Sequence, residues 1–113
     1  MLNKKEIADV LRKAAARIRV PGQWTHGVSA KDDCGREVSP RDSCAVCWCA
    51  SGAIEAETPD YQAFGEVWKE LRAITYMRRL HLVSINDTAD SADAPAKVME
   101  DAAKEIDAME AAV

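Results

Sequence analysis

The residues best suited to chemistry are four cysteines, three of them in the run Cys44-x-x-Cys47-x-Cys49, with Cys34 upstream. Thiolate and imidazole groups are the usual ligands of zinc, so Cys34, Cys44 and Cys47, joined by His26, are a candidate tetrahedral metal site. A closed zinc site normally joins two short-spaced ligand pairs, however, and only one such pair is present. The pattern therefore favours free cysteines packed as small apolar side chains, with no metal and no cofactor.

A second candidate chemistry is nucleophilic catalysis by a cysteine. A cysteine near the start of a helix forms a thiolate more readily when the helix dipole and a histidine assist it. The catalytic alternative uses Cys49 as nucleophile, His81 as base and Asp87 as orienting group, with His26 and Asn86 as other choices for the last two roles. Because neither histidine stands in a known catalytic motif, we expect the chain not to be an enzyme, with a small cysteine hydrolase or transferase as the alternative.

The three tryptophans raise the question of binding. Proteins that bind single-stranded nucleic acids combine stacking aromatic rings with interleaved lysine and arginine side chains. The net charge of −4 argues against general capture of phosphate backbones. Trp48 and Trp68 are therefore expected to be core residues. Trp24, which lies close to His26 in a glycine-bearing segment, is the candidate interface anchor.

Composition limits the elements that can position these residues. The chain of 113 residues contains 20 alanines but only one Phe, three Trp and two Tyr, which predicts a single helical domain over residues 1–113 with a core of small side chains. No apolar run is long enough to cross a bilayer, so we expect a cytoplasmic protein without a membrane partner. Residues 1–20 carry six bases and two acids, whereas residues 84–113 carry eight acids and two bases. The terminal segments should therefore attract each other weakly.

Four prolines divide the chain in a regular way, because proline suits the first turn of a helix and the positions just beyond its end. They predict a mainly α, compact four-helix domain. The expected elements are helices over residues 4–20, 40–54, 59–79 and 93–113, a short β-hairpin or extended loop over 23–38, an apolar strand or helix tail over 80–85 and a loop over 86–93. The uncharged segment 44–54 is expected to be a buried central helix, and Gly52 in it indicates the close approach of another backbone.

Three segments together resemble an uncharacterised family of small bacterial and phage proteins. They are Pro-Gly-Gln-Trp-Thr-His-Gly at 21–27, Trp-Cys-Ala-Ser-Gly-Ala at 48–53 and Asn-Asp at 86–87. The family has an amphipathic first helix, a Gly-x-Trp segment, a Trp-Cys-Ala-x-Gly-Ala helix and an Asn-Asp pair before a C-terminal helix. This chain departs from it at Ile85, where the family usually has Trp, and its other three cysteines lie outside the pattern. The resemblance implies a phage or prophage setting and a fold, without a mechanism.

The lack of a catalytic motif and this resemblance favour a non-enzymatic, phage- or prophage-associated protein-interaction domain that modulates host or host-defence proteins. Its partner is expected to be a protein, bound through Trp24, His26 and the segment 23–38 or through the acidic C-terminal helix. A homodimer is the alternative assembly. Its apolar contacts would come from Val98, Met99, Met109 and Val113, which suit a second chain as well as the domain's own core.

Overall fold

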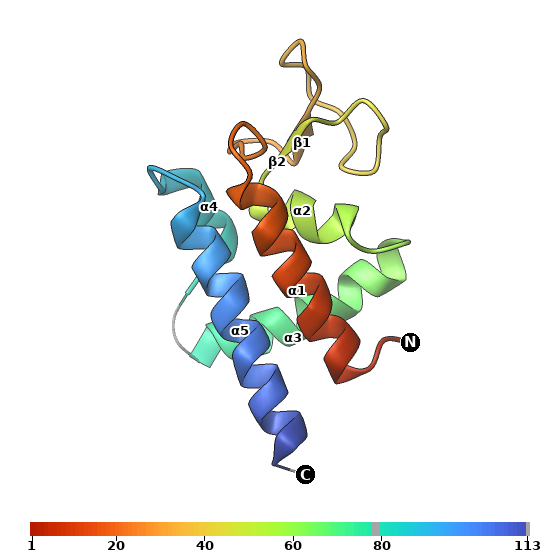
Figure 1. Ribbon diagram of the computed structural model, residues 1–113, viewed down its shortest axis with the longest axis vertical. Helices are drawn as coiled ribbons and strands as arrows, with labels where there is room; N and C mark the ends of the chain where they lie inside the picture. The colour runs from red at the N-terminus through yellow and green to blue at the C-terminus, as the bar shows by residue number, and fades with distance from the viewer. Residues whose placement is uncertain (78–79, 113) are drawn as a thin grey trace.

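Five helices and one pair of short strands make up the part of the chain that the computed structural model describes, residues 1–77 and 80–112. Helices α1 (Lys4–Arg19) and α5 (Asp93–Ala111) lie side by side in opposite directions, and no other two described elements share so extensive a contact. Helix α3 (Tyr61–Met77) crosses behind them (Figure 1). The predicted mainly helical fold is confirmed, with five helices in place of four.

Helix α1 forms where the sequence predicts it. Asn3 and Glu6 build a capping box, because each side chain accepts a hydrogen bond from the backbone N–H of the other, at 2.8 and 3.0 Å. The helix ends at Arg19, before Pro21, which cannot continue it. Its apolar side chains recur at helical spacing and are buried: Ile7, Ala8, Leu11, Ala14, Ala15 and Ile18.

Opposite charges link the terminal helices as predicted. Arg12 pairs with Asp107 at 2.7 Å, and Arg19 pairs with both Asp93 at 2.6 Å and Glu100 at 2.8 Å. These side chains are more than one-third exposed, so each pair contributes about 0–1 kcal/mol. The main stabilisation of the α1–α5 contact therefore comes from the apolar residues that the two helices bury.

The apolar face of α5 is less available to a second copy than the sequence suggests. Met99 is fully buried in the core and Val98 is partly buried against it. Two of the four residues expected to contact a second copy are therefore already packed within the domain. Met109 is exposed, whereas Val113 lies outside the described residues. Helix α5 turns Met99 towards the domain's own core, which is the other role that the sequence offers for this residue.

The strand pairing between α1 and the next helix differs from the expected hairpin. Strand β1 (Ala30–Lys31) pairs antiparallel with β2 (Cys47–Trp48), far along the chain. Residues 30–38 also turn back on themselves through an isolated bridge between Lys31 and Glu37, and the Val38 N–H donates to the Ala30 carbonyl at 3.1 Å. Trp48 in β2 is held on two sides, because its indole N–H donates to the Pro40 carbonyl at 3.0 Å and the Arg17 guanidinium lies 4.4 Å from its ring centre.

The predicted central helix over 40–54 is wrong in its first half. The chain turns through residues 40–46 and forms β2 before helix α2 (Ala50–Ala56) begins. The strand pairing of Trp48 prevents an earlier start, and the Cys49 thiol caps the helix by accepting a hydrogen bond from the Gly52 N–H at 3.3 Å. Consequently Cys44 is exposed and Cys47 half-buried, so only Cys49 is a buried thiol as predicted.

The second half of the chain contains one helix that the sequence did not predict. Helix α3 lies within the expected range, and Arg78 and Arg79, at its predicted end, are outside the described residues. Helix α4 (Leu82–Thr88) covers most of the expected strand or helix tail over 80–85 and the first three residues of the expected loop, because Leu82 and Asn86, one helical turn apart, are both buried. Helix α5 begins at Asp93 as predicted, although no side chain caps it. No helix among the described residues has the length and apolar character needed to span a membrane.

Gly52 supplies a direct test of how α2 is packed. A Cβ atom at this position would lie 2.0 Å from the Ser29 carbonyl oxygen, which confirms the expected close approach of another backbone. We expect Gly52→Ala to lower the free energy of unfolding by about 2–3 kcal/mol, because the two backbones must separate. Urea denaturation followed by far-UV circular dichroism measures the change.

The matched control is Gly65→Ala in α3. A Cβ atom there meets no atom within 4 Å, so alanine should stabilise the helix by up to about 1 kcal/mol through its higher helix propensity. Equal unfolding midpoints for the two variants would contradict the packing of α2 against Ser29.

Candidate functional site

The residues that carry the family resemblance meet at the side chain of Asn86. Its Oδ1 accepts hydrogen bonds from the Trp24 indole N–H at 2.8 Å and from the Ala50 backbone N–H at 3.0 Å. Its Nδ2 donates to the Thr25 carbonyl at 3.2 Å. Asn86 is 1% exposed, so an unpaired amide here would be costly. One buried side chain therefore joins α4 to the start of α2 and to the chain that follows α1.

Asp87 holds the neighbouring loop. Its Oδ1 accepts a hydrogen bond from the Gly27 N–H at 3.0 Å, and Gly27 has a φ of +85°, a conformation that favours glycine. The His26 ring lies edge-on to that of Trp24, with 5.7 Å between ring centres. Trp24 is half-buried and its N–H is engaged by Asn86, whereas His26 is exposed. Of the two predicted interaction residues, His26 thus has the freer side chain.

The three residues of the catalytic alternative have separate surroundings. Cys49 is 9% exposed, and its Sγ lies 3.2 Å from the Ser51 Oγ while it caps α2. His81 is exposed and lies beside α3, at the other end of α4 from Asp87. No hydrogen bond among the described residues joins Cys49 to His81 or Asp87. The structure does bring Asn86 to the start of α2, where its amide forms the structural hydrogen bond with the Ala50 N–H.

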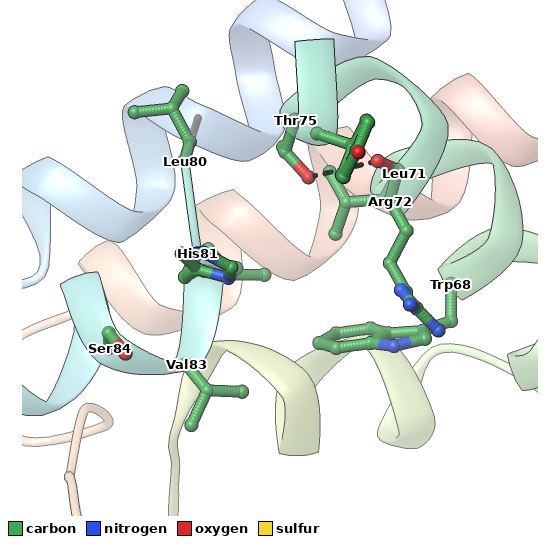
Figure 2. A pocket seen from close by; sticks show the side chains of 10 residues that line it. Trp68, Leu71, Arg72, Thr75, Leu80, His81, Val83 and Ser84 are labelled. Atoms are coloured by element: carbon green, nitrogen blue, oxygen red, sulfur yellow. Dashed lines mark hydrogen bonds between the residues drawn. The ribbon is translucent and has the colours of Figure 1, made fainter. Parts of the chain in front are cut away.

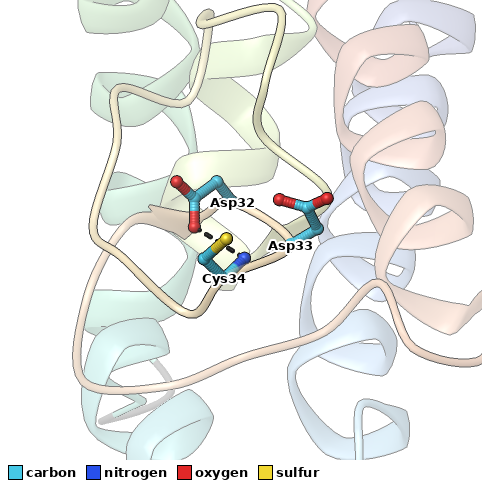
Figure 3. A group of neighbouring side chains, drawn as sticks. All are labelled: Asp32, Asp33 and Cys34. Atoms are coloured by element: carbon cyan, nitrogen blue, oxygen red, sulfur yellow. Dashed lines mark hydrogen bonds between the residues drawn. The ribbon is translucent and has the colours of Figure 1, made fainter.

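The predicted metal ligands are not brought together either. Within the described ranges the one group of three ligand-type side chains whose ligand atoms lie within 4.8 Å of one another is Asp32, Asp33 and Cys34 (Figure 3). It includes neither Cys44 nor Cys47, so the expected set of Cys34 with those two thiols does not form a site of this kind. The group occupies the turn that follows β1.

The Asp32 carboxylate closes that turn. Its Oδ1 accepts hydrogen bonds from the backbone N–H groups of Cys34 at 2.9 Å and Arg36 at 2.8 Å, and its Oδ2 accepts one from the Arg36 Nε at 2.9 Å. The backbone hydrogen bond from Arg36, followed by its side-chain bond, lowers the pKa of Asp32. This carboxylate is therefore engaged in the local structure of the turn.

A groove between α3 and α4 is the remaining candidate site. Figure 2 shows Trp68 and Arg72 of α3 on one side and His81, Val83 and Ser84 on the other. The groove has a volume of about 240 Å³. We call it the α3–α4 groove, and its lining residues are Trp68, Leu71, Arg72, Thr75, Tyr76, Leu80, His81, Leu82, Val83 and Ser84.

Large side chains are exposed along this groove. Tyr76 is 80% exposed and Met77, at its rim, is 81% exposed, while Val83 on α4 is 48% exposed. Trp68 is partly buried against the core, as expected, and it also lines the groove, a role that sequence reasoning missed. The signal was present, since Trp68, Arg72 and Tyr76 are spaced by four residues and so lie along one face of α3.

Comparison with known proteins gives a family without a mechanism. The model of DUF6197, a family of unknown function, matches residues 2–105. No curated protein and no solved structure is significantly similar to the chain. The match agrees with the predicted membership of an uncharacterised family and leaves the chemistry to be argued from the site.

The role of Asn86 can be tested by substitution. We expect Asn86→Ala to lower the free energy of unfolding by about 3 kcal/mol, because the Trp24 indole N–H and the Ala50 N–H lose their buried acceptor. Asp87→Ala is the neighbouring control, and removing this exposed carboxylate should cost less than about 1 kcal/mol. Urea unfolding followed by tryptophan fluorescence measures both values. Similar midpoints for the two variants would show that the amide does not hold the three segments together.

Thiol reactivity tests the surroundings of the cysteines. In native protein at neutral pH, iodoacetamide should modify the exposed Cys34 and Cys44 first, Cys47 more slowly and the buried Cys49 last. Peptide mass spectrometry resolves the four sites, and protein in urea, where all four thiols are accessible, is the control. Preferential modification of Cys49 in native protein would instead favour the cysteine enzyme.

Proposed function

The chain belongs to this family of unknown function, and on that premise we propose that it is a non-enzymatic protein-interaction domain. The observation that carries the proposal is the set of large side chains exposed along the α3–α4 groove, above all Tyr76 and Met77. Large apolar and aromatic residues exposed together are typical of surfaces that contact another protein. The anchor of the interface is thus Tyr76, with Trp68 beside it in the groove.

The catalytic alternative has less support. A cysteine enzyme needs its thiol close to a base that a third group orients. Here Cys49 caps α2, Asp87 binds the Gly27 N–H and His81 lines the α3–α4 groove. Cys49 and Asp87 therefore have structural roles, and His81 lines the groove that we propose as the interface. No catalytic reaction is needed to explain the position of any of the three.

The biological setting rests on the sequence resemblance. The segments at 21–27, 48–53 and 86–87 resemble those of small bacterial and phage proteins, and on this resemblance we propose a phage or prophage setting for the chain. The partner in this proposal is a host protein, for example one of a defence system, and the site of action is the cytoplasm.

Site-directed photo-crosslinking tests the interaction. Tyr76 is replaced by the photoreactive residue p-benzoylphenylalanine in cells that naturally encode the chain, and irradiation should yield a discrete crosslinked protein. Tyr61, which is 74% exposed and about 22 Å away along α3, is the control position and should give no such product. Crosslinks of equal yield at both positions would contradict this surface, and none at either would contradict an interaction role.

A further inference from the structure

The charge around the α3–α4 groove differs from that of the chain as a whole. The chain has 19 acids and 15 bases, yet the described residues that line the groove include Arg72 and His81 and no acid. The groove continues along α3 past Lys69, again without an acid among the described lining residues. An acidic protein therefore presents a surface of opposite sign at the place where its large side chains are exposed.

The two basic residues of α3 at this groove form no ion pair with any other described residue. Among residues 1–77 and 80–112, Lys69 and Arg72 form no ion pair, whereas more than half of the other described lysines and arginines do. The acids of α3 are directed elsewhere, since Glu66 accepts a hydrogen bond from the backbone near the N-terminus and Glu70 pairs with Lys4. Both bases are consequently available to a carboxylate from outside the chain.

The shape of the groove suits one or two apolar side chains. Its volume of about 240 Å³ is below the range of about 300–1,000 Å³ that is usual for pockets holding a whole small molecule. Leu71 and Leu82 are almost fully buried at its base. Trp68 stacks on Phe64, with 5.8 Å between ring centres, which fixes the ring that forms one wall. An aliphatic base with an aromatic wall favours insertion of a leucine, methionine or phenylalanine.

We propose that the α3–α4 groove binds an acidic segment of a partner protein, which inserts an apolar side chain against Trp68 and places carboxylates on Lys69 and Arg72. This inference rests on the proposed function and specifies the partner's chemistry. Figure 2 shows the Arg72 side chain extending towards Trp68, so a bound apolar residue and its flanking carboxylate would be recognised side by side. Recognition would follow the mode in which a short amphipathic segment lies in a groove.

A nucleic acid fits the groove less well. Base stacking needs aromatic faces arranged along a basic channel, whereas here the base of the groove is aliphatic and one face of Trp68 is covered by Phe64. The acidic peptide is therefore the occupant that charge and shape favour together.

Selection from a displayed library of random peptides, about 12 residues long, tests the proposal without knowledge of the partner. Selected peptides should share acidic residues next to a large apolar residue, and their affinity should fall as salt rises. Arg72→Glu should weaken binding at least about tenfold, because it replaces a carboxylate partner by a like charge. Lys13→Glu on α1 makes the same charge change at an exposed lysine without an ion pair among the described residues, and should alter binding less than about twofold.

The other outcomes separate this inference from the proposed function. Peptides that bind equally well to wild type and to Arg72→Glu and Tyr76→Ala would overturn the groove assignment but leave an interaction domain. A selected consensus without acids, or no enrichment above background, would overturn the inference. Binding of a (dT)15 oligonucleotide that Arg72→Glu abolishes would replace the acidic peptide by a nucleic acid. Dimerisation in light scattering that Tyr76→Ala abolishes would make a second copy the occupant.

Discussion

The fold depends on a buried side-chain amide that satisfies backbone and indole groups from two distant segments. Asn86 accepts from Trp24 and Ala50 and donates to Thr25, so α4 is fixed to the start of α2 and to the chain leaving α1. An apolar residue would fill the space but leave the buried Ala50 N–H and the part-buried Trp24 indole N–H without an acceptor. Asn offers an acceptor and donors on one short side chain, which explains why this residue type is required here.

Close backbone packing is the second constraint on the same region. Gly52 lies against the Ser29 carbonyl, and that carbonyl also accepts a hydrogen bond from the Cys49 N–H at 3.1 Å. The segments resembling the Trp-Cys-Ala-x-Gly-Ala and Asn-Asp motifs are therefore explained by packing and hydrogen bonding. Their residues are engaged inside the molecule, whereas the α3–α4 groove, which offers free bases and exposed rings, lies outside these motifs.

The sequence predicted those features that depend on local pattern or on charge. Helix α1, the helical character of 61–77 and the start of α5 follow from apolar spacing, and the attraction of the terminal helices follows from their opposite charges. It failed where a distant contact decides the local structure. Trp48 lies in a strand because residues near 30 and 24 pair with it, and α4 is helical because Leu82 and Asn86 are buried together. The spacing of Trp68, Arg72 and Tyr76 indicates one wall of the groove, but the other wall depends on where α4 is placed, which local pattern does not determine.

The hydrogen bonds of Asn86 have a consequence for the order of folding. They span 62, 36 and 61 positions of the chain. The chain must therefore lose the conformational entropy of closing these long loops before any of the hydrogen bonds can form. Helices such as α1 can form from neighbouring residues, but the amide has no partners until α2, α4 and the segment after α1 arrive. These three parts should therefore become ordered in one late, cooperative step, and opening any one of them exposes the others to solvent exchange.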